Sequence, residues 1–377
     1  MLTTSRADYS HLYWVLHELR THADIDLHTI VLGAPLAEEF GRTVQEMEAD
    51  GFPVDERIEC LLSSDSDVGM AKTIGLATLG LAERLSQRRP DLMLLVADRY
   101  ESLAPASVAL AFRIPLAHIE GGEVSEGAID DATRNALTKL SHLHFTPTER
   151  ARRRVIAMGE EPWRVHRTGA PSLDHLRRSV LLDRAALAAR LGFEVTDATV
   201  VVAYHPVTLA DDTLFEADAL FAALQRIDAP VVFCFPNADA GGRRLAERAK
   251  SFCDARQRAT LFVNLNPVVY WSLLSHCGLM VGNSSSGIME TPALKLPTVN
   301  VGMRQQGRER APNVLDAPAD GDAITMAIER ARSASFRESL SGMENPYGDG
   351  DAAPRIVRVL AEVELDRLLM KKATSVD

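Results

Sequence analysis

The 377-residue chain lacks several features that would place it in a specialised class of protein. It has no run of eighteen uncharged apolar residues, and residues 1–11 lack the apolar region of a signal peptide, so we expect no membrane span. Its four cysteines are widely spaced and form no Cys-x-x-Cys pair. This spacing argues against a disulfide framework or a cysteine-based metal site, and a reducing cytoplasm is the expected compartment.

Basic charge is also scarce, because 41 lysines and arginines accompany 52 aspartates and glutamates, giving a formal net charge of -11. Proteins that bind nucleic acids generally need a basic face, so we expect no nucleic-acid partner. An anionic small molecule is still permitted, since a diphosphate needs only a local cluster of donors. The chain is 46% apolar and 25% charged, which is typical of a globular enzyme, and its length fits two domains.

Segments with strand-like and helix-like composition alternate along almost the whole chain. The predicted strands are 25–32, 91–97, 114–119, 142–145, 199–203, 230–235, 260–263, 278–281 and 298–301, and the helices predicted between the first of them are 36–49, 69–88 and 100–112. This alternation predicts an α/β fold with doubly wound parallel sheets that carry helices on both faces.

The alternation is interrupted near residues 169–184. We therefore predict a Rossmann-like domain at 1–175, a second at 176–350, and a C-terminal helix at 351–377 that packs back on the first domain, with ligands bound in a cleft at the carboxyl ends of the strands. Only Met1–Ser5 precede the first strand-to-helix turn, so either the first strand is very short or the recorded start lies downstream of the true one.

A serine-rich segment follows the predicted strand that ends at Val281. If a helix begins within these serines, its unpaired N–H groups and positive partial charge suit phosphate oxygens, and Ser284 and Ser285 add hydroxyl donors. Glu290 would lie about one and a half turns into that helix, where a carboxylate suits the hydroxyls of a ribose. The alternative is an ordinary serine cap followed by a surface glutamate.

Acidic residues collect after predicted strands in the first half of the chain. Asp98 follows one strand, Glu120 and Glu123 follow the next, and Asp130 begins a helix. Crowded carboxylates at neighbouring strand ends have displaced pKa values and can act as acids and bases in proton transfer at carbon. Helix capping and magnesium binding are the alternatives, although no dedicated metal-ligand spacing is present.

Polar groups also follow strands in the second half of the chain. His205 lies at a strand end, Asn237 and Asp239 lie in a turn after another, and Arg304 begins a basic loop at 302–310. A histidine can donate to a phosphate, and arginine forks suit phosphate oxygens. Read singly, these segments could equally be a structural histidine, a plain turn and a solvated loop.

In this order the segments resemble the hydrolysing UDP-N-acetylglucosamine 2-epimerases, including the bacterial sialic-acid pathway enzymes and the epimerase half of the bifunctional animal enzyme. The resemblance spans about residues 5–316. It is carried by Arg-Ala-Asp-Tyr-Ser at 6–10, Asp-Arg-Tyr at 98–100, His-Ile-Glu-Gly-Gly-Glu at 118–123, His-Pro-Val-Thr at 205–208, Phe-Pro-Asn-Ala-Asp-Ala-Gly at 235–241, Gly-Asn-Ser-Ser-Ser-Gly at 282–287 and Arg-Gln-Gln-Gly-Arg-Glu at 304–309.

The resemblance implies a glycosyltransferase-B-type pair of domains and a reaction that uses no metal and no nicotinamide or other cofactor. UDP is eliminated across C1–C2 of UDP-N-acetylglucosamine to leave a 2-acetamidoglucal, and water then adds to release N-acetylmannosamine. The implied catalytic residues are Asp98, Glu120 and Asp130, with Arg134 holding the acidic cluster. The implied substrate- and UDP-binding residues are Arg6, Ser10, Arg99, Glu123, His205, Asn237, Asp239, Ser284, Ser285, Glu290 and Arg304.

The chain departs from the family pattern at Ala97, since a glycine usually precedes the aspartate that Asp98 matches. The added methyl group at a tight strand end could displace Asp98. Segment 69–85 is apolar around much of its circumference and is expected to be deeply buried or shared between subunits. Because relatives assemble as dimers or tetramers, the resemblance implies a homodimer or homotetramer.

Several other functions fit the same motifs. The first keeps the reaction and changes the substrate to a 2,4-diacetamido-trideoxyhexose linked to UDP or GDP, as in legionaminic-acid pathways. The others are a non-hydrolysing epimerase, a glycosyltransferase of the same fold, and a sugar-nucleotide sensor without activity. No single residue of the sequence decides among them.

Overall fold

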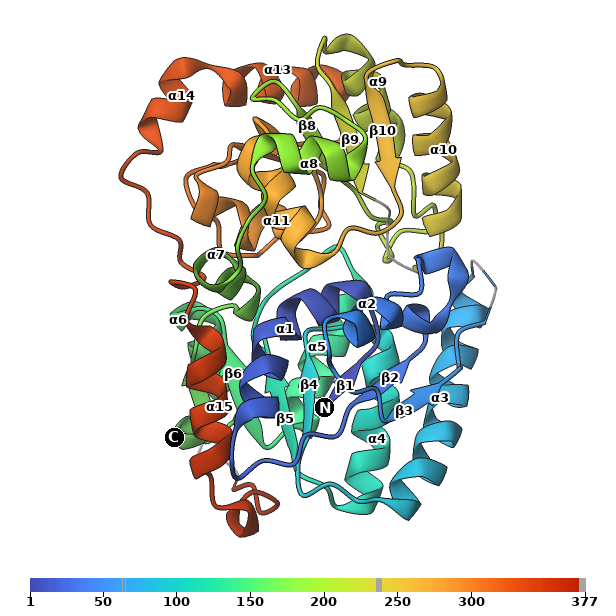
Figure 1. Cartoon of the computed structure of the whole chain (residues 1–377), viewed down its shortest axis with the longest axis vertical. Helices are drawn as coiled ribbons and strands as arrows, with labels where there is room; N and C mark the ends of the chain where they lie inside the picture. Colours follow the sequence, from blue (N-terminus) through green and yellow to red (C-terminus); the bar gives the residue numbers. More distant parts are fainter. Residues whose placement is uncertain (63, 65, 235–238, 373–377) are drawn as a thin grey trace. The chain divides into compact units, whose positions relative to one another are not determined.

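The computed structural model describes residues 1–62, 64, 66–234 and 239–372, which form two compact α/β units (Figure 1). Unit 1 comprises Met1–Glu123, Ile129–Arg177 and Tyr347–Asp377, and unit 2 comprises Val124–Ala128 and Arg178–Pro346. Every strand pairing is parallel. The predicted fold class, an α/β chain with two Rossmann-like sheets, is confirmed.

The strands of unit 1 form two groups that lie side by side. The strands are β1 (Leu2–Thr3), β2 (Ile30–Leu32) and β3 (Glu56–Ile58), in the order β1-β2-β3, and β4 (Met93–Val96), β5 (Leu116–Ile119), β6 (Leu143–Thr146) and β7 (Val165–Arg167), in the order β4-β5-β6-β7. β1 has two residues, and it lies against β4. The order in which successive strands are added therefore reverses between β1 and β4, and this is the topological switch point of the unit.

Helices cover both faces of the unit 1 strands. They are α1 (Arg6–Thr21), α2 (Val44–Ala49), α3 (Asp67–Gln87), α4 (Leu103–Phe112), α5 (Ile129–Leu140), α6 (Glu149–Ala157), α7 (Asp174–Arg178) and α15 (Ala352–Glu362). Alternate residues of β4 enter different cores: Leu94 and Val96 pack with α1 and α15, whereas Met93 and Leu95 pack with α3 and α4. This alternation is what a strand with two covered faces requires.

Two predicted elements of unit 1 were wrong in extent. The helix predicted at 36–49 is divided into two 3-10 turns and α2, because Gly41 and Arg42 both adopt left-handed backbone conformations. The strand predicted at 25–32 is reduced to Ile30–Leu32. The N–H of Thr29 donates to the Asp55 carboxylate at 2.7 Å, so a side chain takes the place of a ladder partner there.

Unit 2 is built on a six-stranded sheet with the order β10-β9-β8-β11-β12-β13. The strands are β8 (Val200–Ala203), β9 (Val231–Cys234), β10 (Ala259–Phe262), β11 (Leu279–Gly282), β12 (Thr298–Val301) and β13 (Val314–Ala317). The helices are α8 (Arg184–Leu191), α9 (Ala217–Arg226), α10 (Gly242–Asp254), α11 (Pro267–His276), α12 (Ser286–Met289), α13 (Gly321–Arg332) and α14 (Ala334–Ser339). This strand order places the switch point between β8 and β11.

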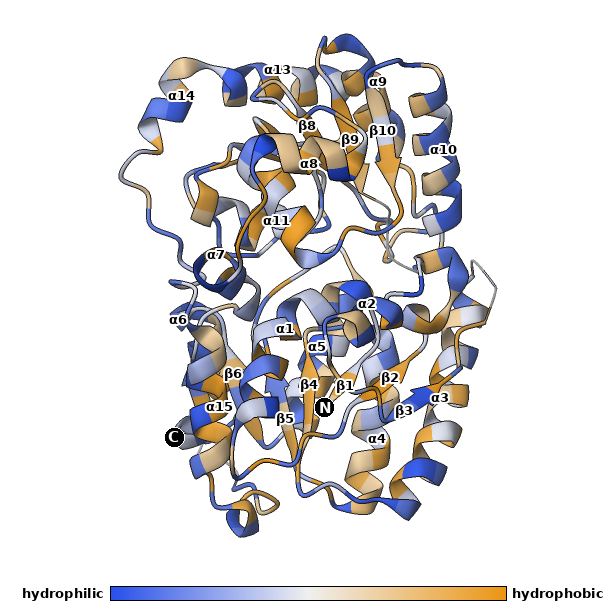
Figure 2. Cartoon of the chain, viewed as in Figure 1, coloured by the Kyte–Doolittle hydropathy of each residue, from blue (hydrophilic) through white to orange (hydrophobic). Residues whose placement is uncertain are grey.

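The central strands β8 and β9 of unit 2 are also composed of apolar residues, and Figure 2 colours β8, β9 and β10 largely as hydrophobic. Val200 and Val202 pack into the core beneath α9 and α13, and Val201 and Ala203 pack into the core beneath α8 and α11. None of the helices within the described ranges combines the length and hydropathy of a membrane-crossing segment.

Candidate active site

The unit 1 switch point collects the loops that follow β1, β4 and β5. Arg6 is the first residue of α1, directly after β1, and Asp98 follows β4. Glu120 follows β5, the neighbour of β4. The sheet topology therefore gathers the predicted acids and the Arg6–Ser10 motif at the carboxyl edge of one set of strands, where ligands of doubly wound proteins bind.

Arg134 on α5 connects two of these loops. Its side chain is buried, its Nη2 donates to Asp98 Oδ2, and its Nη1 donates to the Glu123 carbonyl oxygen at 3.1 Å. The Asp131 carboxylate lies 3.6 Å from the same Nη1. A buried guanidinium is tolerable only where anions and carbonyls compensate its charge, so Arg134 and Asp98 depend on each other.

The strands β4 and β5 both end in a residue with left-handed backbone, Ala97 at φ 58° and Glu120 at φ 65°. This conformation costs a non-glycine residue about 1 kcal/mol. The Ala97 N–H donates to the Ile119 carbonyl at 2.9 Å, and the Glu120 N–H donates to the Phe145 carbonyl at 2.7 Å. Ala97 thus keeps a conformation that glycine would adopt freely, and strained turns of this kind gather at functional sites.

His118 supports the Ala97 turn from within the sheet. It is fully buried, and its Nε2–H donates to the Ala97 carbonyl oxygen at 2.7 Å. Burial lowers the pKa of His118 to about 4, so the imidazole is neutral at neutral pH. The sequence marked His118 only as part of a motif, and its bond to the residue before Asp98 was not foreseen.

Glu120 and Glu123 each have a partner that the sequence analysis missed. The Glu120 Oε1 lies 2.8 Å from His11 Nδ1, and Tyr347 donates its hydroxyl to Glu123 Oε2 at 3.2 Å. His11 directly follows the Arg-Ala-Asp-Tyr-Ser motif, which is a signal that could have been used. Tyr347 lies 224 residues from its partner, and nothing near Glu123 in the sequence points to it.

The remaining predicted residues of unit 1 differ in their surroundings. Asp130 is buried in the first turn of α5. Arg6 and Ser10 lie on successive turns of α1, and the Ser10 carbonyl accepts from His175 Nε2 at 3.1 Å. Arg99, predicted to contact the nucleotide, is buried; its Nη2 donates to Glu101 Oε1 at 3.1 Å, and its guanidinium stacks on the Tyr100 ring.

Asn283 organises the switch point of unit 2. Its Oδ1 accepts from the His205 N–H at 2.7 Å and its Nδ2 donates to the His205 carbonyl at 2.8 Å. Its own carbonyl accepts from Arg304 Nη1 at 3.2 Å and from Gln305 Nε2 at 3.0 Å. Three predicted segments, after β8, β11 and β12, therefore converge on one asparagine that the sequence analysis did not single out.

The helix predicted to begin within the serines is much shorter than expected. α12 has only four residues, and Glu290 is its C-cap, so the placement of Glu290 well inside a helix was wrong. Pro292 has no N–H with which to continue the α-helix, and the chain instead forms a 3-10 turn at Thr291–Leu294. Ser286 donates to Glu290 Oε2 and lies 2.6 Å from the Tyr270 hydroxyl, whereas Ser284 and Ser285 are partly exposed.

The loop after β12 carries Arg304, and hydrogen bonds hold the conformation of this loop. Gly302 has φ 73°, and an added Cβ would lie 1.9 Å from the Glu216 carboxylate, whose Oε1 accepts from the Met303 N–H at 3.2 Å. Arg310 donates to the Gln305 carbonyl at 3.1 Å, which is a hydrogen bond between two residues of the same loop. Segment Val124–Ala128 covers this loop, since the Glu126 N–H donates to the Gln306 carbonyl at 3.2 Å.

The last predicted pair follows β9 in the sequence. Asp239 is buried, and its carbonyl accepts from the Gly242 N–H at 2.9 Å at the start of α10. Asn237 lies outside the described residues. Across the described ranges, His, Cys, Asp and Glu side chains form no group of three or more that could hold a metal ion.

Comparison with known proteins identifies the family of the chain. A family model described as UDP-N-acetylglucosamine 2-epimerase matches residues 17–361. The chain belongs to this family.

Two relatives of this 2-epimerase family member align with almost the whole chain. GDP/UDP-N,N'-diacetylbacillosamine 2-epimerase (hydrolyzing) of Campylobacter jejuni is 34% identical over 98% of the chain and 97% of that protein. UDP-N,N'-diacetylbacillosamine 2-epimerase (hydrolyzing) of Legionella pneumophila is 34% identical over 99% of the chain and 98% of that protein. These matches confirm the resemblance to hydrolysing 2-epimerases.

A solved structure shows the same fold as this family member. The UDP-GlcNAc 2-epimerase of Neisseria meningitidis, bound to UDP-GlcNAc, superposes with a TM-score of 0.79 at 18% identity. The superposition covers 96% of the chain and 99% of that structure. At this identity the likeness establishes the fold.

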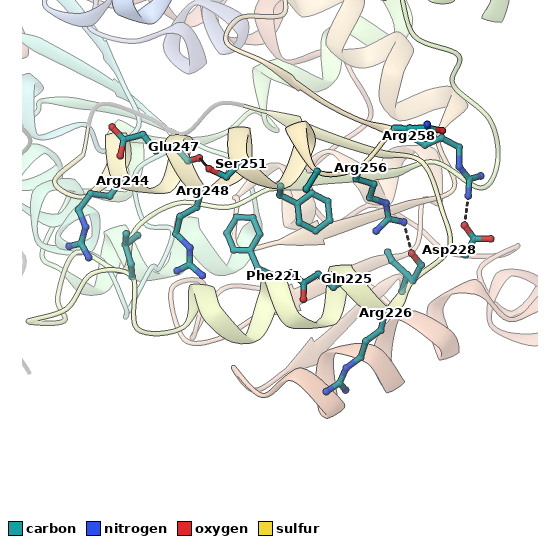
Figure 3. A pocket seen from close by; sticks show the side chains of 15 residues that line it. Phe221, Gln225, Arg226, Asp228, Arg244, Glu247, Arg248, Ser251, Arg256 and Arg258 are labelled. Carbon is teal, nitrogen blue, oxygen red and sulfur yellow. Dashed lines mark hydrogen bonds and ion pairs between the residues drawn. The ribbon is translucent and has the colours of Figure 1, made fainter.

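Unit 2 of this family member also has an arginine-rich groove of about 1160 Å³, lined by none of the predicted site residues (Figure 3). It lies between α9 and α10. Arg248 and Arg258 pair with Asp218 and Asp228, and Arg256 donates to backbone carbonyls that include that of Leu224 at 2.8 Å. Each of these three guanidinium groups has a partner within the protein, and the pair of Arg248 with Asp218 joins α10 to α9.

Proposed function

We propose that the protein is a hydrolysing 2-epimerase that acts on UDP-linked N,N'-diacetylbacillosamine, a 2,4-diacetamido-trideoxyhexose, and releases UDP and the free sugar inverted at C2. The observation that carries the substrate is the 34% identity, over 98% and 99% of the chain, to two relatives that bear this activity in their names. The conserved architecture and the acids at the unit 1 strand ends support the reaction type.

The proposed reaction has two balanced steps. In the first, a base takes the C2 proton, the C–H electron pair forms the C1=C2 double bond, and the C1–O bond breaks with its electrons leaving on UDP. In the second, water adds a hydroxyl to C1 and C2 receives a proton on the opposite face. Asp98, Glu120 and Asp130 are the proposed acids and bases, with Arg134 holding Asp98 in place.

The nucleotide is proposed to bind through unit 2. Elimination places charge on the departing diphosphate, so donors that strengthen as this charge develops accelerate the step. His205 and Arg304 have their positions set by Asn283, which supports a shared role toward phosphate oxygens. The remaining proposed contacts are those of Ser284 and Ser285 to phosphate, of Glu290 to ribose, and of Arg6, Ser10, Arg99, Glu123, Asn237 and Asp239 to other parts of the substrate.

A second candidate substrate is UDP-N-acetylglucosamine. It is favoured by the description of the family model that matches residues 17–361. The two sugars differ at C4 and C6, away from the C1–C2 bond that reacts, so the same acids would serve both.

A homodimer or homotetramer is also proposed, with α3 and α4 in the contact between copies. These two helices pack together and leave apolar side chains in solvent: Leu76 is 41%, Leu79 is 72% and Leu110 is 60% exposed. An apolar face of this kind is typical of a surface that another subunit covers.

The test is incubation of the purified protein with UDP-N,N'-diacetylbacillosamine, its GDP counterpart and UDP-N-acetylglucosamine, followed by ¹H and ³¹P NMR. We expect free UDP and a free C2-inverted sugar, formed fastest from the diacetamido substrate. Faster turnover of UDP-N-acetylglucosamine would select the second candidate. An intact epimerised nucleotide sugar, or no turnover of any substrate, would overturn the proposed function.

A further inference from the structure

A histidine outside the predicted site contacts one of the predicted acids. His11 on α1 places Nδ1 2.8 Å from Glu120 Oε1, and the two side chains are only 13% and 6% exposed. Because a carboxylate oxygen accepts, the imidazole donates from Nδ1. We propose that His11 is a positioning residue for Glu120 in the epimerase reaction, an inference that rests on the function proposed above.

The helix that carries His11 is fixed at its first turn. Asp8 Oδ2 accepts from the Thr4 N–H and the Thr4 hydroxyl, both at 2.8 Å, and from the Ser5 N–H at 3.0 Å. Ser5 in turn accepts from the Asp8 N–H, which completes a capping box. His11 lies three residues after Asp8, so its Cα position follows from a helix start that is held by several buried bonds.

The backbone of Glu120 is equally constrained. Its left-handed conformation is held by the 2.7 Å bond from its N–H to the Phe145 carbonyl on the neighbouring strand. With both backbones held, the contact between His11 and Glu120 fixes the rotation of the carboxylate. One oxygen is bound to the imidazole and the other is presented in a single direction, which is the condition for efficient proton transfer to or from a bound substrate.

Titratable groups around His11 include Glu120 from the end of β5, His175 from α7, and Asp8 one turn earlier on α1. Burial lowers the pKa of His175 to about 4, and that ring donates to the Ser10 carbonyl, so it is neutral at neutral pH. The Asp8 carboxylate accepts the N–H and hydroxyl groups of the helix start.

The test compares wild type with H11A and H11N, and with H17N as the matched control on the same helix. We expect H11A to lower kcat on the order of 100-fold, the cost of a misplaced reacting group, while UDP affinity measured by calorimetry stays unchanged. H11N restores much of kcat, because the asparagine amide can donate as Nδ1 does. H17N retains wild-type behaviour.

Two outcomes of the kinetic test would overturn the inference: wild-type kcat in H11A, or a loss of kcat in H11N as large as in H11A. A separate measurement does not depend on turnover. Histidine-selective ¹⁵N NMR should show a protonated Nδ1 that is missing from H11N and loses its hydrogen-bonded shift in E120A. Persistence of that shift in E120A would remove the pair. A wild-type protein inactive on every sugar nucleotide would refute the proposed function, while this spectrum would still decide the contact.

Discussion

The side-chain amide of Asn283 pairs with both backbone polar groups of His205, accepting from its N–H at 2.7 Å and donating to its carbonyl at 2.8 Å. This pairing holds the ends of β8 and β11 together at the switch point of unit 2. A side-chain amide donates and accepts side by side in this way without carrying charge. The position of the loop after β8 therefore depends on the chemistry of one fully buried residue.

Replacing Asn283 by aspartate keeps the shape and removes the donor. N283D would place a carboxylate oxygen against the His205 carbonyl, so we expect a loss of about 2 kcal/mol in the free energy of unfolding and a UDP affinity reduced by about tenfold. Urea unfolding and calorimetry measure the two effects. N266D is the matched control, because Asn266 caps α11 through Oδ1 and aspartate caps equally well. Unchanged UDP affinity in N283D would separate this residue from the nucleotide site.

Removing the Arg134 guanidinium leaves Asp98 without its buried partner. We expect R134M to lose about 3 kcal/mol of unfolding free energy and to have little activity, because breaking a buried ion pair leaves an uncompensated charge. Denaturant unfolding and UDP release give the two readouts. Arg153 on α6 is paired with Glu149 at the surface, so R153M should change stability by less than about 1 kcal/mol. Equal effects of the two substitutions would contradict the assigned role of Arg134.

The left-handed conformation of Ala97 predicts an unusual response to glycine. In A97G the relief of backbone strain, about 1 kcal/mol, offsets the entropy that glycine loses on folding, so stability should stay near that of wild type. A189G, at an exposed position in the last turn of α8, should instead lose up to about 1 kcal/mol. Thermal unfolding of both variants measures the difference. A loss in A97G as large as in A189G would show that Ala97 is not strained.

Buried histidines predict a loss of stability in mild acid. Burial lowers the pKa values of His118, His142 and His175 to about 4, from a usual value near 6.5. The unfolded chain therefore binds protons that the folded chain does not, and stability falls as the pH drops from about 6.5 to about 4, by as much as about 3 kcal/mol per group. Urea unfolding at pH 7, 6 and 5 measures the slope, which should be shallower in H175Q.

The alternation of apolar strands and helices was enough to predict the fold class, because strands such as β4 and β8 are buried on both faces. The short edge strands β3, β7 and β13 were missed. Each is partly exposed and carries charged residues, such as Glu56 and Arg57 in β3, so its composition resembles that of a loop.

Residues at strand ends could be proposed for the site from sequence, since the carboxyl edge of a parallel sheet is set by topology. The residues that hold these side chains in position could not be proposed from the sequence. His118 and Asn283 act through bonds to backbone atoms, and His11 and Tyr347 act on acids far away in the chain. Such contacts depend on how elements pack, which local patterns do not encode. The roles of the predicted site residues remain predictions for the experiments above.

The chain passes from one unit to the other after Glu123, Ala128, Arg177 and Pro346. Swapping either unit for that of a relative would require four junctions to match at once, two of them flanking the five-residue segment Val124–Ala128. Recombination is therefore a poor route to new specificity in this architecture. Changes of nucleotide base or sugar should instead have accumulated through single replacements in the loops that follow the strands.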